Sequence, residues 1–138
     1  MTTKSTEALV QRYYDAFNRG DIDAMIDCLS PSFVHHVNEG EKRKGKVKFR
    51  AFCEHMSKCY KEELKDVVIM SSKDGSRAAA EFMVHGKYLE TDGNLPKAAG
   101  QKYKLPGGAF IAVADGGITR VTTYYNLHDW IAQVSGKS

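Results

Sequence analysis

Residues 11–25 constrain the fold of this chain more than any other segment, because they combine two helical patterns with a sharp break between them. Apolar side chains recur at helical spacing before the break. This stripe consists of Leu9, Tyr13, Ala16 and Phe17. Gly20 ends the first pattern, and Asp21 is a suitable N-cap for a second helix. The segment therefore predicts two consecutive amphipathic helices, each with one face toward a core.

The next 35 residues predict a short strand and a third helix. Ser5 is the expected N-cap of the first helix, and residues 30–31, Ser-Pro, are expected to end the second. Residues 33–37 form a short β-like run, followed by a charged loop through Gly45. Helical spacing then returns in a set of apolar residues. They are Phe49, Phe52, Met56, Cys59 and Tyr60.

The remainder of the chain is rich in β-like runs. The four runs cover residues 66–70, 77–88, 102–114 and 118–126. Asp74-Gly75 and residues 115–117 supply hairpin turns, which predicts mainly antiparallel pairing. Residues 89–101 are expected to form a lid or a hairpin tip, and residues 127–134 a short closing helix. The order predicts one α+β domain over residues 1–138, with three N-terminal helices packed in a curved, mainly antiparallel sheet.

Composition excludes several classes of protein. The 138 residues fit one core, and no run approaches the about 18 apolar residues that cross a membrane. No signal-peptide pattern is present, so a cytoplasmic location is expected. Three cysteines without CxxC spacing argue against disulfides and zinc knuckles. A net charge of +3, concentrated in residues 42–48, does not favour nucleic-acid binding.

The first helix and its turn resemble a known family. Tyr13 within the helix, followed by Asn18-Arg19-Gly20-Asp21, is similar to the start of NTF2-like proteins, which include ketosteroid isomerases and SnoaL-type polyketide cyclases. This resemblance covers nearly the whole chain and implies a cone-shaped fold around a pocket. It also implies a small apolar ligand, no cofactor, and a homodimer formed through the β-rich face.

The resemblance gives Tyr13 a possible catalytic role. In the isomerases the matching tyrosine donates a hydrogen bond to a developing oxyanion. Their base aspartate matches about Val37 here, so a different base is needed. The cyclases carry an aspartate base that matches roughly Thr123, which cannot act as a base near neutral pH. Tyr13 is about equally consistent with a core tyrosine whose hydroxyl finds any partner.

Two histidines are further candidates for catalysis. Alternation places His35 on the same strand face as Phe33 and Val37, where its imidazole could act as general base or acid. A structural histidine bonded to the backbone is the alternative, and a slightly better one. His85 resembles the middle-strand histidine of scytalone dehydratase, another NTF2-like enzyme. It could instead lie on the outer sheet face, where NTF2-like proteins dimerise.

Apolar residues complete the predicted site. The expected substrate-binding wall consists of Phe17, Phe33, Val37, Phe52, Met56, Thr123, Tyr125 and Trp130. For Trp130, packing as a plug at the end of the cone is a better interpretation than stacking on a ligand. No metal motif or phosphate-binding loop is present, so cofactor-free isomerisation or dehydration is predicted. The alternative is a non-catalytic ligand binder or a dimeric interaction module, with Val84, Tyr88 and Phe110 on the dimer face.

Overall fold

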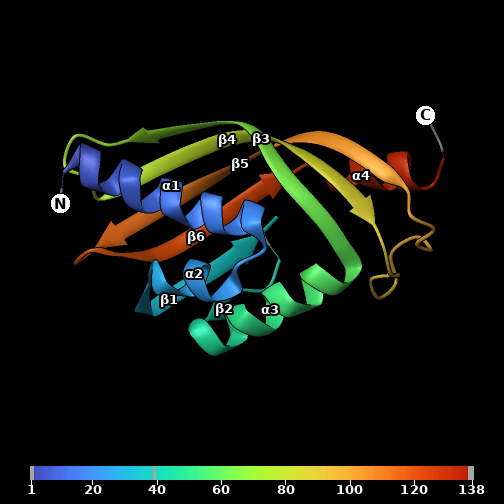
Figure 1. Ribbon diagram of the computed structural model, residues 1–138, viewed down its shortest axis with the longest axis horizontal. Helices are drawn as coiled ribbons and strands as arrows, with labels where there is room; N and C mark the ends of the chain where they lie inside the picture. Colours follow the sequence, from blue (N-terminus) through green and yellow to red (C-terminus); the bar gives the residue numbers. More distant parts are fainter. Residues whose placement is uncertain (1, 39, 137–138) are drawn as a thin grey trace.

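The computed structural model describes residues 2–38 and 40–136 and shows an α+β fold (Figure 1). The helices are α1 (Thr3–Arg19), α2 (Ile22–Asp27), α3 (Lys46–Cys59) and α4 (Leu127–Val134). The strands are β1 (Leu29–Val37), β2 (Arg43–Lys44), β3 (Tyr60–Ser71), β4 (Arg77–Tyr88), β5 (Lys102–Ala114) and β6 (Gly117–Tyr125). Three helices lie in the N-terminal half, and α4 follows the last strand.

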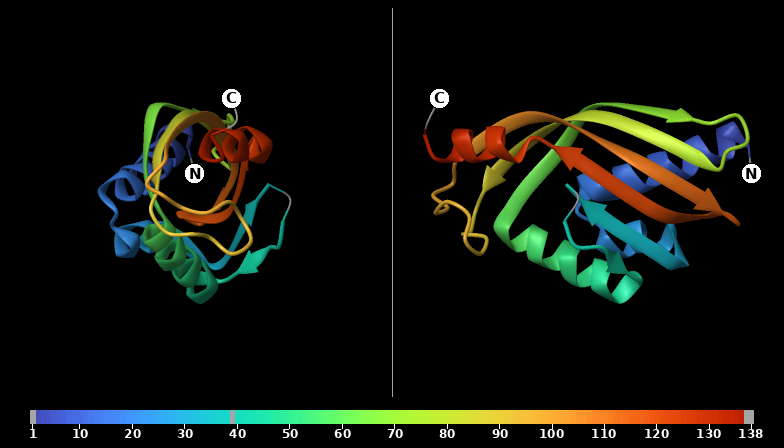
Figure 2. Two further views of the ribbon diagram at one scale, coloured as in Figure 1. Left: turned by 90° about the vertical axis from the view of Figure 1, so that its right-hand side faces the viewer. Right: turned by 180° about the vertical axis from the view of Figure 1, so that it is seen from behind.

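The strands form one curved, mixed sheet. Its order is β2-β1-β6-β5-β4-β3, with every neighbouring pair antiparallel except β1 and β6, which are parallel. Seen end-on in Figure 2, the sheet curls, and α1, α2 and α3 lie along its open side. Among the described residues, no helix has both the length and the hydropathy needed to cross a membrane.

Local capping explains where the first two helices begin and end. The Thr2 side chain accepts a hydrogen bond from the Ser5 backbone N–H at 3.0 Å, so α1 begins earlier than the Ser5 cap predicted. Gly20 ends α1 with a φ of 71°, a left-handed conformation that glycine adopts without strain. Asp21 then caps α2 through the Ala24 N–H at 3.0 Å, as the sequence predicted.

Two element boundaries differ from the sequence-based expectation. Helix α2 ends at Asp27, and strand β1 already begins at Leu29, because the segment before Phe33 runs beside β6. Strand β3 begins at Tyr60, so the residues before Asp66 are strand as well. The register of β3 shifts between Lys65 and Val68, and Asp66 there has a φ of 55°. Such a bulge bends a strand and hides its alternation.

Alternation along the sheet assigns its two faces. Val84 and Tyr88 are buried on the inner face, so the prediction that they form an external dimer face is wrong. Phe110 lies on the outer face and is 57% exposed. Three other strand residues expose apolar side chains, namely Val68, Met70 and Tyr124. Leu89, just after the end of β4, is exposed as well.

Candidate functional site

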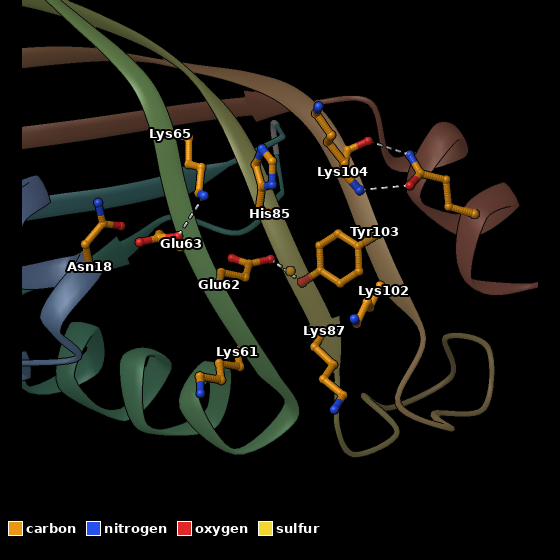
Figure 3. A pocket seen from close by; sticks show the side chains of 12 residues that line it. Asn18, Lys61, Glu62, Glu63, Lys65, His85, Lys87, Lys102, Tyr103 and Lys104 are labelled. Atoms are coloured by element: carbon orange, nitrogen blue, oxygen red, sulfur yellow. Dashed lines mark hydrogen bonds and ion pairs between the residues drawn. The ribbon is translucent and has the colours of Figure 1, made fainter.

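A glutamate and a tyrosine meet across the middle of the sheet. Glu62 on β3, Gly86 on β4 and Tyr103 on β5 are register partners in one row. The Tyr103 hydroxyl donates a hydrogen bond to Oε2 of Glu62. Figure 3 shows the two side chains pointing toward each other over β4. This contact requires the absence of a side chain at Gly86, since a Cβ there would collide with the Tyr103 ring.

Aromatic residues surround this pair on the inner side. The Trp130 ring of α4 lies 5.9 Å from Tyr103, 5.9 Å from Tyr60 and 5.0 Å from Tyr88, in edge-on contacts. Tyr60 and Tyr88 stack at 5.4 Å between ring centroids. Trp130 is only 4% exposed, so it closes this end of the fold as the plug that the sequence analysis allowed.

The surroundings change the proton affinity of these groups. Burial raises the pKa of the Glu62 carboxyl, and the hydrogen bond from Tyr103 opposes that shift only in part. Burial also raises the pKa of Tyr125, and the negative charges of Glu62 and Asp92 raise it further. Glu62 is therefore a carboxyl whose proton affinity is moved toward neutral pH, which suits a group that takes and returns a proton.

A second polar group lies at the end of α3. The Tyr60 hydroxyl donates to Oδ2 of Asp92 at 2.6 Å. The His55 Nε2 lies 2.7 Å from Oδ1 of the same carboxylate, and the Cys59 Sγ lies 3.8 Å from that nitrogen. Asp92 belongs to the loop between β4 and β5, so this group joins that loop to the helix.

Tyr13 and His35 lie in an aromatic cluster around Phe49. The Tyr13 ring lies 6.4 Å from Phe49, and the His35 ring lies 4.9 Å from it. His35 also contacts Phe33 at 6.2 Å and Phe52 at 4.7 Å. Both predicted catalytic side chains are about 96% buried, at 4% exposure each, so a ligand reaches them only if this cluster opens.

Burial governs the chemistry of these two residues. Burial is the main reason that the pKa of Tyr13 is raised well above the usual value for tyrosine, and the interaction with Tyr14 raises it further. Burial and the charges of Arg43 and His36 lower the pKa of His35 to about 3. The Nδ1 atom of His35 is buried without a hydrogen-bond partner among residues 2–38 and 40–136. His35 is consequently neutral at pH 7 and a weak base in this conformation.

His85 lies on a different face from Tyr13 and His35. It is partly exposed and lines a pocket of about 680 Å³ over β3, β4 and β5. The Glu62–Tyr103 pair lines the same pocket, at the row where Gly86 has no side chain. Most other lining side chains are charged (Figure 3). They are Lys61, Glu63, Lys65, Lys87, Lys102 and Lys104.

The predicted substrate-binding wall divides between these regions. Phe33 is fully buried in the cluster around Phe49, and Thr123 on β6 is the register partner of Val37 on β1. The remaining members are only partly buried and pack against the core, which leaves part of each ring or chain accessible. They are Phe17, Phe52, Met56 and Tyr125. Whether any of them binds a substrate stays a prediction.

Sequence reasoning missed Glu62, Tyr103 and the group around Asp92. The signal for Glu62 was the alternation of Tyr60, Glu62 and Leu64, which all lie on the inner side of β3. A charged residue at an inward position is uncommon and therefore points to function. Surrounding lysines and glutamates concealed that pattern in the sequence.

Comparisons with known proteins agree with the fold. A SnoaL-like domain model matches residues 10–121. A candidate polyketide cyclase from Silicibacter sp. TM1040 is 58% identical with a TM-score of 0.93, over 97% of this chain and 98% of that protein. One from Pseudomonas putida is 53% identical with a TM-score of 0.92, over 97% and 98%.

A more distant structure shows how far the architecture extends. An NTF2-like protein from Burkholderia xenovorans is 14% identical with a TM-score of 0.77, over 97% of this chain and 98% of that protein. At this identity the likeness concerns the fold alone. The comparison with proteins of curated function found no match to this chain. The family match and the two close structures together show that the chain belongs to the SnoaL-like family of the NTF2-like superfamily.

Proposed function

We propose that this protein is a cofactor-free enzyme that moves a proton on a small, mostly apolar molecule. The observation that carries the proposal is the inward Glu62 carboxyl, held by the Tyr103 hydroxyl beside an aromatic wall. A carboxyl with a raised pKa is suited to act as general base and then as general acid. Isomerisation and dehydration are the reaction classes that such a group serves.

The roles follow from the positions of the atoms. Glu62 removes a proton from a carbon next to a substrate carbonyl. The resulting enolate needs a hydrogen-bond donor, and the Tyr103 hydroxyl is beside the carboxyl to supply one. Tyr125 and Met56 offer apolar surface to the rest of the ligand, since both are partly accessible. Ring closure of a polyketide also begins with carbon deprotonation, so the names of the two close relatives are compatible with this chemistry.

The test is hydrogen–deuterium exchange at carbon. Ligands are first found by thermal-shift screening of steroid, polyketide and terpenoid ketones. Exchange of the acidic C–H of each bound ketone in D₂O is then followed by NMR. Glu62→Gln keeps the size of the side chain and an acceptor for Tyr103 but removes the base. We expect exchange to slow about 10²- to 10⁴-fold.

A glutamate on the adjacent strand gives a matched control. Glu81 lies on β4 with an exposed side chain, and it does not line this pocket. Glu81→Gln removes the same charge from the sheet outside the site, so exchange should stay near the wild-type rate. Equal slowing in both variants would indicate a general effect of charge and would contradict Glu62 as the base.

The assignment of Tyr13 as oxyanion donor and His35 as base is retained as a second proposal for the same reaction class. It is supported by their common contact with Phe49 and by the unpartnered Nδ1 of His35. His85 is retained as a further acid or base because it lines the same pocket as Glu62. Tyr13→Phe and His35→Ala variants in the exchange assay test the pair.

A non-catalytic role is the alternative function. The exposed apolar side chains of the outer sheet face favour a dimeric module, and we propose that the protein forms a homodimer through this face. Ligand binding without any exchange at carbon would support this alternative. The cytoplasmic location also stays a prediction, supported by three free, buried cysteines.

A further inference from the structure

Three potential metal ligands converge at the C-terminal end of α3. They are Nε2 of His55, Sγ of Cys59 and a carboxylate oxygen of Asp92, and all lie within 4.8 Å of one another. His55 and Cys59 are four residues apart in the helix, so their side chains share one face. Asp92 reaches them from the loop between β4 and β5. We propose that this group binds a divalent transition metal, with Zn²⁺ as the best fit.

The donor types favour Zn²⁺ over harder ions. One imidazole nitrogen, one thiolate and one carboxylate oxygen are all established zinc ligands, whereas Mg²⁺ and Ca²⁺ prefer oxygen alone. Three protein ligands leave a fourth position, and the side chain of His55, 51% exposed, gives solvent access to it. The arrangement therefore corresponds to a zinc site with one open position.

Two of the three ligand separations are close to those that a zinc ion requires. Zinc binds nitrogen and oxygen at about 2.0–2.2 Å and sulfur at about 2.3 Å. A tetrahedral site then separates nitrogen from oxygen by about 3.3 Å. His55 Nε2 and Asp92 Oδ1 are 2.7 Å apart, so these two atoms must separate slightly. Cys59 Sγ is already 3.8 Å from His55 Nε2, which is close to the separation needed.

Neighbouring groups already hold the ligands in position. The Tyr60 hydroxyl donates to Oδ2 of Asp92 at 2.6 Å, which leaves Oδ1 directed at His55. The Asp92 N–H donates to the Tyr88 hydroxyl at 2.9 Å. The Cys59 carbonyl accepts the Leu89 N–H at 2.7 Å, which ties the loop to the helix end. Such outer contacts orient ligands in established metal sites.

Cobalt substitution tests the site directly. Purified protein treated with EDTA is titrated with Co²⁺, and absorption reports thiolate coordination through a sulfur-to-cobalt charge-transfer band. We expect one equivalent to bind with this band, and Zn²⁺ to displace it. His55→Gln and Asp92→Asn should each weaken binding at least about tenfold, and Tyr60→Phe by about 10- to 100-fold. Cys59→Ser should abolish the band.

Two controls make the outcome decisive. Cys53→Ser removes another buried thiol of α3 and should leave the band unchanged. Glu62→Gln should also leave metal binding unchanged, so this test succeeds or fails independently of the proposed function. Absence of the band in the wild-type protein, or equal Co²⁺ affinity in the wild type, His55→Gln and Asp92→Asn, would overturn the proposal. Circular dichroism confirms that each variant is folded.

Discussion

At the scale of single residues, His35 is the clearest case of a polar group placed at a cost. Its Nδ1 is buried without a partner in the described part of the chain, and such an atom costs about 1–3 kcal/mol. The rings of Phe33, Phe49 and Phe52 surround it, so a fourth carbocyclic ring would suit these apolar surroundings better than an imidazole. A polar residue kept in such a place is a candidate for function.

His35→Phe is expected to stabilise the protein by about 1–3 kcal/mol at pH 8, and by more at pH 5. The folded-state pKa of about 3 lies below the unfolded value of about 6.5. The unfolded chain therefore binds the proton more readily, and wild-type stability falls as the pH drops from about 6.5 toward 3. Urea unfolding at both pH values measures the difference.

His36→Phe is the matched control for this change, because His36 is adjacent and points to the opposite face of β1. It should give no comparable gain in stability. A loss of stability in His35→Phe would show that Nδ1 has a partner in solution. Loss of carbon exchange in a stabilised His35→Phe variant would support His35 as the base.

At the scale of elements, the row formed by β3, β4 and β5 depends on one glycine. Gly86 lets the Tyr103 ring lie across β4 and reach Glu62. Two amides complete the edges of this part of the sheet. Asn18 bonds the backbone of Leu64 on β3, and Gln133 bonds the backbone of Lys104 on β5. The site therefore lies on strands whose backbone groups are hydrogen-bonded to neighbouring strands or to these amides.

Gly86→Ala should destabilise the protein by about 1–3 kcal/mol, because the added methyl group displaces the Tyr103 ring. It should also slow carbon exchange, since the Glu62–Tyr103 contact is lost. Chemical denaturation and the exchange assay measure the two effects. Gly108→Ala on β5 is the control, because its Cβ would meet only the Ala80 carbonyl oxygen, at 3.3 Å. A stable, fully active Gly86→Ala variant would contradict the role given to this row.

The sequence allowed some elements to be predicted well and others poorly. The bounds of β4 and β5 were predicted correctly, because long alternating runs and glycine turns mark them. The start of β3 was missed because Tyr60 continues the apolar spacing of α3 and charged residues follow it. Glu62 was missed for the same reason. The side chains that meet across neighbouring strands are set by the register of the strands. The sequence of one strand alone does not determine that register.

At the scale of the whole molecule, the outer sheet face determines the expected assembly. Phe110 and Tyr124 contact each other at 6.1 Å and are 57% and 39% exposed. Val68 and Met70 on β3 are also exposed apolar residues. An apolar sheet face of this kind is typical of protein interaction sites.

We expect light scattering to give twice the mass of one chain for the wild-type protein and the mass of a single chain for Phe110→Glu. A buried, unpaired carboxylate at the interface would strongly disfavour association. Val47→Glu is the control, because Val47 is 85% exposed on α3, away from this face, and should remain dimeric. A wild-type mass of one chain at every concentration would contradict the homodimer.

The parallel pairing of β1 with β6 also bears on how the chain is made. The ribosome releases β1 early, but its long partner is the last strand to emerge, and until then only the two-residue β2 can pair with it. The core cannot close during synthesis of the first hundred residues. Folding is therefore expected to begin within the β3–β4–β5 meander and to finish only once β6 has emerged, when the earliest strand is finally enclosed.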